Sequence, residues 1–266
     1  MTAVVTLASA ARLDHVRRQQ ARLAGADVER VVVWLDAEEP PALDGAIVLH
    51  VPPGAHGMRL AAGRNLGVAE ATARGHGLLV LLDADCVPGP NLLAAYAAAA
   101  ASHQDGLLCG AVTYLAQGVT VEADTDLAAL TAPHPARPAP AVGDLVEAAP
   151  EEYPLFWSLS FATTPAGWAR IGGFDEAYEG YGGEDTDLAF RARDAGAPLV
   201  WVGGADAYHQ HHPTSSPPWQ HLDDILRNGA LFHGRWGTWP MTGWLEAFEA
   251  AGAVVREGDG TGWRRA

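Results

Sequence analysis

The feature that most constrains this chain is a run of five aliphatic residues that leads into two aspartates. Leu78–Leu82 contains only Leu and Val, Asp83 follows directly, and Asp85 comes two residues later. Such a run predicts a strand buried on both faces, as in parallel sheets covered by helices. Ligands of these sheets bind beyond the carboxyl ends of the strands. Because alternate residues of an extended segment point the same way, the two carboxylates can converge on one cation, and oxygen ligands favour Mg²⁺ or Mn²⁺. The alternative is a solvated turn, since Asp and Pro are common turn residues.

Strand and helix patterns alternate through the first 114 residues. Strands are predicted over Ala3–Leu7, Arg30–Leu35, Ala46–Val51, Leu78–Leu82 and Leu107–Tyr114, and helices over Arg12–Ala24, Arg64–Arg74 and Asn91–Ser102. This alternation predicts an α/β fold with a Rossmann-like, mostly parallel sheet flanked by helices. A chain of 266 residues suits one large domain or two small ones, and we expect a single large domain.

The pattern dissolves between residues 117 and 154 into Pro, Ala and acidic residues, which predicts a variable loop. Order returns in the last third of the chain. A strand is predicted over Phe156–Thr164, helices over Pro165–Ile171, Asp187–Ala195 and Trp219–Phe232, and a last strand over Leu199–Val202.

Charge and composition exclude several classes of function. The net charge of −15 argues against nucleic acid as a partner. No apolar run approaches the ~20 residues that cross a bilayer, and the N-terminal residues lack the features of a signal peptide. Cys86 and Cys109 fall in predicted buried strands, which suits free thiols in a reducing compartment. We therefore expect a cytoplasmic protein without a transmembrane segment, with peripheral docking at a membrane as the open alternative.

A second dense signal is the glycine-rich, acidic passage 172–188, GGFDEAYEGYGGEDTDL. Its glycines let the backbone turn sharply and approach a ligand closely. Glu184, Asp185 and Asp187 then fall at a predicted helix N-terminus, where negative charge is favoured. For Asp187 helix capping is the preferred interpretation. For Asp185 capping competes with a role as a general base.

The blocks LLDADCVP and GGFDEAYEGYGGEDTDLAFR lie about 100 residues apart and together resemble the nucleotide-sugar-dependent glycosyltransferases of the GT-A fold, family-2 type. The second block resembles the C-terminal segment of the β-1,4-galactosyltransferases in particular. The segments FWSLSF at 156–161 and RLDHV at 12–16 also fit, so the resemblance covers most of residues 1–212.

The resemblance implies an inverting, metal-dependent transfer of a sugar from a nucleoside-diphosphate sugar, most readily a UDP-sugar, to an acceptor hydroxyl of a carbohydrate or small molecule. It implies a donor-binding half over 1–116, a lid over 117–154, and an acceptor-binding and catalytic half over 155–266. The donor-binding residues would be Arg12, Asp36, Arg64, Asn65, Asp83 and Asp85. The catalytic residues would be Glu184 and Asp185, with Asp185 as the base. The acceptor-binding residues would be Trp157, Tyr181, Gly183 and Glu184, with the two aromatic rings stacking on sugars or, alternatively, packing in the core.

A cluster of histidines follows the last predicted strand, where the galactosyltransferase-like enzymes place a metal-binding histidine. His209 matches best by position, and His211 would lie on the same side of an extended segment, so that His212 would point away. With Asp85, these imidazoles predict a site for Mn²⁺ in preference to Mg²⁺. A solvated histidine cluster is the alternative.

Two other classes of protein remain as alternatives. A nucleotidyltransferase would also use an Asp-x-Asp metal site, but residues 7–12 lack the glycine-rich basic loop that it needs. A non-catalytic carbohydrate- or metal-binding module would explain the tryptophans of the last 30 or so residues, but has no need for a general base. The residues leave open the sugar, the acceptor, the oligomeric state and the role of this tryptophan-rich tail.

Overall fold

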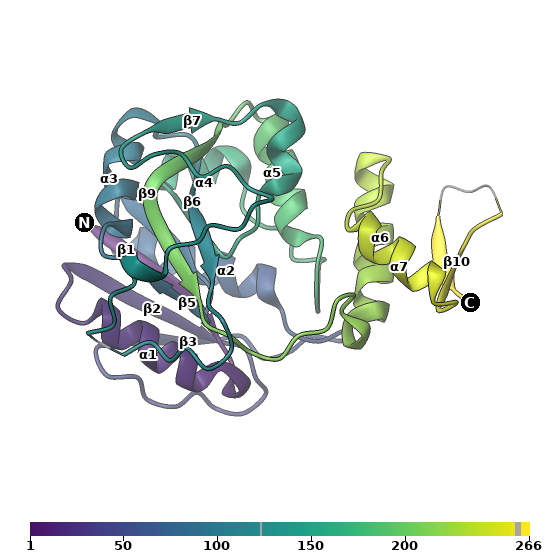
Figure 1. Cartoon of the computed structure of the whole chain (residues 1–266), viewed down its shortest axis with the longest axis horizontal. Coiled ribbons are helices and arrows are strands. Elements are labelled where there is room, and N and C mark those ends of the chain that lie inside the picture. Colours follow the sequence, from purple (N-terminus) through teal and green to yellow (C-terminus); the bar gives the residue numbers. More distant parts are fainter. Residues whose placement is uncertain (123, 259–261) are drawn as a thin grey trace.

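The computed structural model describes residues 1–122, 124–258 and 262–266, and centres on one nine-stranded sheet (Figure 1). The strand order is β3-β2-β1-β4-β8-β6-β9-β5, and β7 pairs with β9 outside this path. The strands are β1 Thr2–Ala8, β2 Val28–Trp34, β3 Ala46–His50, β4 Leu78–Leu82, β5 Cys86–Pro88, β6 Leu107–Tyr114, β7 Leu145–Glu147, β8 Ser160–Thr163 and β9 Leu199–His209.

The directions of the strands create one functional edge. Strands β1, β2, β3, β4, β6 and β9 run the same way, while β8, β5 and β7 run against them. The predicted mostly parallel sheet is thus confirmed. The carboxyl ends of β1, β2, β4, β6 and β9 therefore meet at one edge, where ligands of α/β sheets bind.

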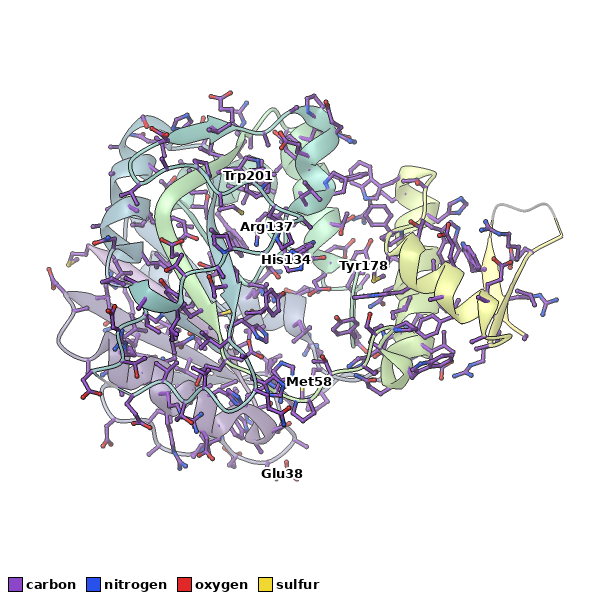
Figure 2. The ribbon with its side chains drawn as sticks, viewed as in Figure 1. Glu38, Met58, His134, Arg137, Tyr178 and Trp201 are labelled. Atoms are coloured by element: carbon purple, nitrogen blue, oxygen red, sulfur yellow. The ribbon has the colours of Figure 1, made fainter. Side chains whose placement is uncertain are left out.

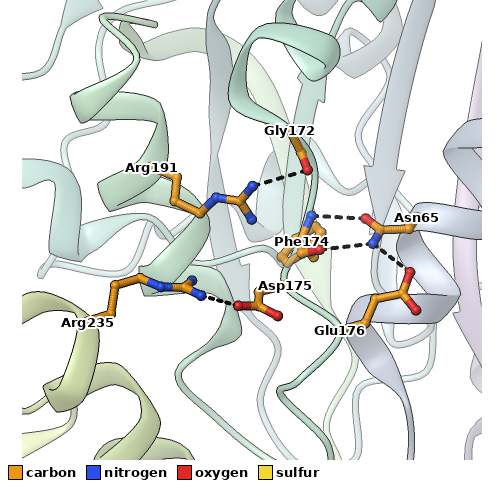
Figure 3. Close-up of a pocket in the computed structure, with 7 residues that line it drawn as sticks. All are labelled: Asn65, Gly172, Phe174, Asp175, Glu176, Arg191 and Arg235. Carbon is orange, nitrogen blue, oxygen red and sulfur yellow. Dashed lines mark hydrogen bonds and ion pairs between the residues drawn. The ribbon is translucent and has the colours of Figure 1, made fainter.

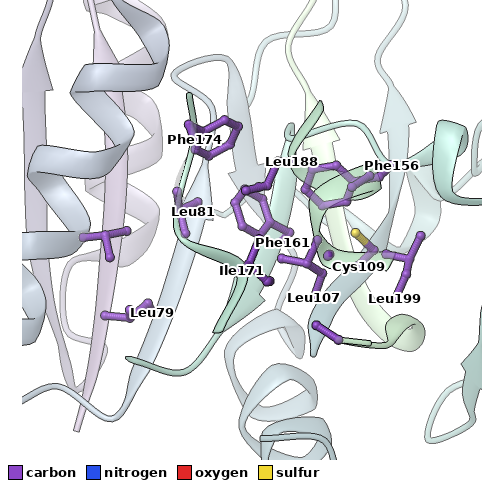
Figure 4. Close-up of a cluster of buried hydrophobic side chains, with 14 of the residues drawn as sticks. Leu79, Leu81, Leu107, Cys109, Phe156, Phe161, Ile171, Phe174, Leu188 and Leu199 are labelled. Carbon is purple, nitrogen blue, oxygen red and sulfur yellow. The ribbon is translucent and has the colours of Figure 1, made fainter. Parts of the chain in front are cut away.

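Helices cover both faces of the sheet, as the aliphatic run of β4 predicts. Leu79 and Leu81 point into one apolar cluster together with residues of α2 (Leu60–Ala73), α4 (Pro165–Ile171) and α5 (Glu184–Asp194), part of which is drawn in Figure 4. Val80 points into the opposite cluster with residues of α1 (Leu13–Leu23) and α3 (Leu92–Ser102). Alternation along one strand thus supplies side chains to both cores.

The fold differs from the prediction at several places after residue 116. The region 117–154 is not loop throughout, because it contains β7 and the start of a 3₁₀ helix at Pro150–Leu155. Strand β8 begins only at Ser160, and β9 continues to His209, seven residues beyond its predicted end. Strand β9 continues because β6 pairs with it as far as Tyr114 and β5 pairs with its final residues.

The C-terminal residues form a smaller unit at the side of the sheet, reached from β9 through residues 210–218 (Figure 1). It comprises α6 (Leu222–Trp236), α7 (Thr242–Ala250) and the hairpin of β10 (Val254–Arg256) and β11 (Trp263–Arg265). Its own apolar cluster includes Trp263 and, at its margin, Trp239 and Trp244, so that much of the tryptophan-rich tail is packing. In the described part of the chain, no helix has both the length and the apolarity to cross a membrane.

Candidate active site

The end of β4 and the end of β9 bring three possible metal ligands together. Among the described residues, Asp85, His209 and His212 each offer one ligand atom, and these atoms lie within 4.8 Å of one another. The His209 Nε2 atom is 3.5 Å from Asp85 Oδ1, and the His212 Nε2 atom is 3.2 Å from Asp85 Oδ2. The antiparallel pairing of β5 with β9 places Cys86 opposite His209, which fixes this approach.

The predicted orientation of His211 and His212 is wrong. His211 is absent from the ligand group, and its backbone carbonyl faces His15 Nε2 at 3.4 Å, whereas His212 contacts Asp85. Alternation requires an extended chain, but the strand ends at His209, and only the bond from the N–H of Gln210 to the carbonyl of Asp85, 2.6 Å, continues the pairing with the β5 side. Alternation does not hold past the end of a strand.

The charges around Asp85 suit a cation. Burial alone would raise the pKa of Asp85, but the hydrogen bond from His212 and the charges of His209, His212 and Arg12 outweigh it and lower that pKa to about 2. Burial lowers the pKa of His209, which favours the uncharged ring, whose lone pair can bind a metal ion. Arg12 Nε lies 3.2 Å from Asp85 Oδ2, as expected for a residue beside this site. One carboxylate and two imidazoles form a donor set that fits Mn²⁺.

A single arginine joins the two sequence motifs. Arg64, on α2, is 4% exposed and contacts Asp83 Oδ1 through Nη2 at 3.2 Å and Glu184 Oε1 through Nη1 at 3.1 Å. Its guanidinium also lies over the ring of Phe174, 5.0 Å from the ring centre. Burial raises the pKa of Asp83 to about 6, although the charge of Arg64 opposes this. Two motifs about 100 residues apart thus meet at one side chain.

Asp185 carries a carboxyl group whose pKa lies near neutrality. It lies in the first turn of α5, whose N-cap is Gly183 with a φ of 89°, a conformation that glycine adopts without strain. Burial and the neighbouring charge of Glu184 raise the pKa of Asp185 to about 7. Its Oδ1 accepts hydrogen bonds from the backbone N–H of Thr186 at 2.7 Å and from the Thr186 hydroxyl at 3.3 Å, which orient the carboxyl group.

Asp187, by contrast, binds the C-terminal unit instead of capping its own helix. Its Oδ1 accepts from Arg235 Nη1 at 2.7 Å and from Trp236 Nε1 at 2.8 Å, both at the end of α6. The side chain is fully buried. The capping interpretation is therefore wrong, because the docking of α6 provides stronger partners than the helix terminus.

The sequence pattern did not identify the residues of α6 that hold the glycine-rich loop. Asn228 donates through Nδ2 to the carbonyls of Glu179, Tyr181 and Gly182 at 3.0, 3.2 and 2.9 Å. Asp224 Oδ2 accepts from the backbone N–H of Tyr181 at 3.2 Å. The available signal was an Asn within a helical pattern, since Asn is unfavourable in helix interiors.

The remaining predicted donor residues lie in different places. Asp36 follows β2 at the functional edge, where its Oδ2 accepts from the N–H of Ala10 at 2.5 Å. Asn65 points the other way, because neighbouring helix residues face different directions. Its amide exchanges hydrogen bonds with the backbone of Phe174, at 2.9 Å each, at a separate cavity of about 460 Å³ (Figure 3). Asn65 thus positions the glycine-rich loop and does not join Asp83 and Asp85.

The two predicted sugar-stacking rings already make contacts within the protein. Trp157 meets His134 edge to face with ring centres 5.1 Å apart. Tyr181 stacks on His221 with ring centres 4.3 Å apart and planes at 11°, and its burial and the charges of Asp185 and Glu184 raise its pKa. One face of Tyr181 is therefore covered by protein, and any sugar would meet the remaining surface.

Sequence comparisons point to glycosyltransferases. A family model described as the N-terminal domain of galactosyltransferase matches residues 148–213, the segment that carries Trp157, Asp185 and His209. Validoxylamine A glucosyltransferases from Streptomyces hygroscopicus subsp. jinggangensis and subsp. limoneus are 42% identical over 45 residues, which are 17% of this chain and 11% and 10% of those proteins. The chain thus spans about a tenth of the length of these relatives.

Solved structures share the fold over most of this chain. GalNAc-T7 with UDP, GalNAc and Mn²⁺ superposes with a TM-score of 0.56 at 16% identity, over 89% of this chain and 48% of that chain. Residues 1–349 of Staphylococcus aureus TarS superpose with a TM-score of 0.57 at 14% identity, over 88% of this chain and 64% of that chain. The TarS complex with UDP-GlcNAc gives 0.55 at 13% identity, over 81% of this chain and 60% of that chain. The chain therefore has the fold of the GT-A glycosyltransferases and carries a galactosyltransferase-like segment.

Proposed function

We propose that this chain is a glycosyltransferase that moves a sugar from a UDP-sugar to an acceptor hydroxyl, with inversion at the anomeric carbon. The observation that carries the proposal is the contact of Arg64 with both Asp83 and Glu184. This contact brings the ligand group at Asp85 and the base at Asp185 to the same edge of the sheet. Support also comes from solved relatives of the same fold, which bind UDP with Mn²⁺ in one case and UDP-GlcNAc in another.

Asp85, His209 and His212 would hold a divalent metal ion, for which Mn²⁺ is the best match. Such an ion offsets the negative charge of a departing diphosphate. Arg12, 3.2 Å from Asp85, would lie beside the same phosphates, and Asp83 and Asp36 would face the nucleotide. These residues bind and orient the donor at the carboxyl ends of β1, β2 and β4.

Asp185 would take the proton from the acceptor hydroxyl as the oxygen attacks the anomeric carbon and the bond to the diphosphate breaks. Its raised pKa, about 7, gives a carboxylate basic enough to accept that proton near neutral pH. Glu184 is held by Arg64 at 3.1 Å, and its charge beside Asp185 helps to raise the pKa of Asp185. Trp157 and Tyr181 would border the acceptor.

The test is slow hydrolysis of UDP-sugars with Mn²⁺ and no acceptor, measured as UDP release. Asp85→Ala and His212→Ala should each lose several kcal/mol of transition-state stabilisation, because the diphosphate charge is then poorly neutralised. The matched control is His211→Ala, which removes a neighbouring imidazole outside the ligand group and should retain activity. Activity that survives EDTA, or that depends on His211 in place of His212, contradicts this metal assignment.

Product stereochemistry tests the mechanism independently. Direct displacement predicts an inverted anomeric configuration in the NMR spectrum of the product, and retention rules it out. Binding of UDP and Mn²⁺ without hydrolysis or transfer would support the non-catalytic binding module instead.

A further inference from the structure

Arg137 is a buried arginine whose charge has no carboxylate partner. It lies in the proline-rich stretch 132–140 and is 7% exposed. Its Nε and Nη1 atoms are buried without a hydrogen-bond partner, and Nη2 makes only a long contact of 3.5 Å to the carbonyl of Gly110. None of the ion pairs among the described residues includes Arg137. A buried, unpaired cation is costly, so a missing anion is the simplest explanation.

The described side chains around Arg137 include two indole rings and a thiol. Its guanidinium carbon lies 5.4 Å from the ring centres of both Trp157 and Trp201. The indole Nε1 of Trp201 is also buried without a partner. Burial raises the pKa of the neighbouring Cys109 thiol to about 12, although the charge of Arg137 and a hydrogen bond with it oppose this, so the thiol stays uncharged and does not neutralise the arginine. Three unsatisfied donor atoms at one place call for a ligand with several acceptor oxygens.

A row of rings connects this place with the proposed active site. His209 stacks on Tyr114 at 4.6 Å between ring centres, Tyr114 meets His134 at 5.5 Å, and His134 meets Trp157 at 5.1 Å. The guanidinium of Arg137 in turn lies over the ring of Trp157. Figure 2 places Arg137 beside His134 and Trp201 on the side of the sheet that the 117–154 region crosses. Three rings, those of Trp157, His134 and Tyr114, therefore separate Arg137 from His209.

We propose that Arg137 binds an oxyanion, a phosphate or a carboxylate, that the acceptor carries. This inference rests on the proposed transferase function. A guanidinium suits the task, because its planar fork binds oxyanions through two hydrogen bonds while its flat faces stack on indole rings.

Binding of the anion is tested by calorimetric titration of inorganic phosphate into the whole protein in EDTA, which prevents binding through a metal ion. The wild type should bind saturably, and Arg137→Met should bind at least about tenfold more weakly, because hydrogen bonds to a charged group are lost. The control is Arg193→Met, which removes an equal charge from an arginine stacked on Phe190 at 4.4 Å and should titrate like the wild type. No saturable binding by the wild type, or equal binding by Arg137→Met, overturns the proposal.

If Arg137→Met does not fold, Arg137→Lys takes its place, because lysine keeps the positive charge but lacks the planar guanidinium that makes two hydrogen bonds. Phosphate affinity of this variant equal to that of the wild type would overturn the proposal.

The source of the anion is tested with paired acceptors, glucosamine 6-phosphate against glucosamine and glucuronate against glucose. The wild type should prefer an anionic member, and the arginine variant should lose this preference. If no anionic member is preferred while phosphate binds, the assignment to the acceptor is wrong. Acceptor-free donor hydrolysis by the wild type reports separately on the proposed function, which the phosphate titration does not require.

Discussion

Replacing Arg64 by methionine leaves two carboxylates without the cation that they share. Arg64 is 4% exposed and lies within 3.2 Å of Asp83 and 3.1 Å of Glu184. Breaking a buried ion pair by removing one partner costs about 3–5 kcal/mol, because the remaining charge stays buried and uncompensated. For a chain of this size such a loss lowers the melting temperature by ~6–20 °C. Arg64→Met should therefore be among the more destabilising single substitutions in residues 1–116.

The assay is thermal unfolding of Arg64→Met beside Arg74→Met. Arg74 pairs with Glu29 at 2.6 Å in an exposed position, so the same substitution there should cost much less. The loss at Arg64 should also depend on pH. Burial already raises the pKa of Asp83 to about 6, and removal of Arg64 raises it further, so the ionised carboxylate destabilises the variant most at high pH. The difference from the wild type should shrink as the pH falls through the raised pKa of Asp83 in the variant towards about 6, where the wild-type carboxyl also gains a proton. Equal losses for the two variants, or a difference that grows in acid, would refute the reasoning.

Further predictions concern Asp185, the start of helix α5 at Gly183, and residues 131–141. Asp185→Asn should bind the donor normally but transfer the sugar about 10²–10⁴-fold more slowly, which calorimetry beside a turnover assay checks. Wild-type turnover should rise as the pH increases through about 7, because only the ionised carboxylate accepts a proton, and a pH–rate profile checks this. Gly183→Ala should lose about 1–2 kcal/mol in thermal unfolding, because its φ is 89° and the added Cβ would lie 3.2 Å from the Tyr178 ring. Replacing residues 131–141 by a short Gly-Ser linker should raise the acceptor KM or abolish transfer, while donor affinity stays unchanged. If transfer is unaltered, this segment is a passive loop.

Most of the sheet could be predicted from the sequence because its strands are aliphatic runs bounded by Gly, Pro or Asp. β4, β6 and α4 begin and end at the predicted residues. β7 was missed because its three residues are exposed and therefore carry no burial pattern. The end of β9 was missed because Gly203 and Gly204 interrupt its apolar pattern, while pairing with two other strands sustains it. A strand held by its neighbours needs no strong pattern of its own.

The candidate site was predictable only where one motif supplied several residues. The Asp83–Asp85 strand end and the Glu184–Asp185 helix start are local patterns, and the structure places both at the functional edge. The choice between His211 and His212 depended on the path of an irregular segment, which periodicity does not describe. The bonds of Asp187 and Asn228 depend on how α6 docks. Contacts that arise from docking leave no local signature in the sequence.

Asn228 shows how far the active-site loop depends on such docking. It is 1% exposed, and its two amide hydrogens serve carbonyls of the loop that leads to Gly183. Asn228→Asp keeps the shape, removes both donors and places a carboxylate against carbonyl oxygens. We expect a loss of about 2 kcal/mol or more, since each buried group left unsatisfied costs about 1–3 kcal/mol. Amide hydrogen exchange over 179–183 should accelerate, and transfer should slow because Asp185 is held less firmly.

The matched control is Asn91→Asp, which makes the same chemical change at the exposed N-cap of α3. There a negative charge is favourable, so stability should be unchanged or slightly increased. If Asn228→Asp is as harmless as Asn91→Asp, α6 merely covers the loop. If it loosens the loop and slows transfer together, the C-terminal unit positions the base, and the tail that packs behind α6 is a structural requirement of the active site.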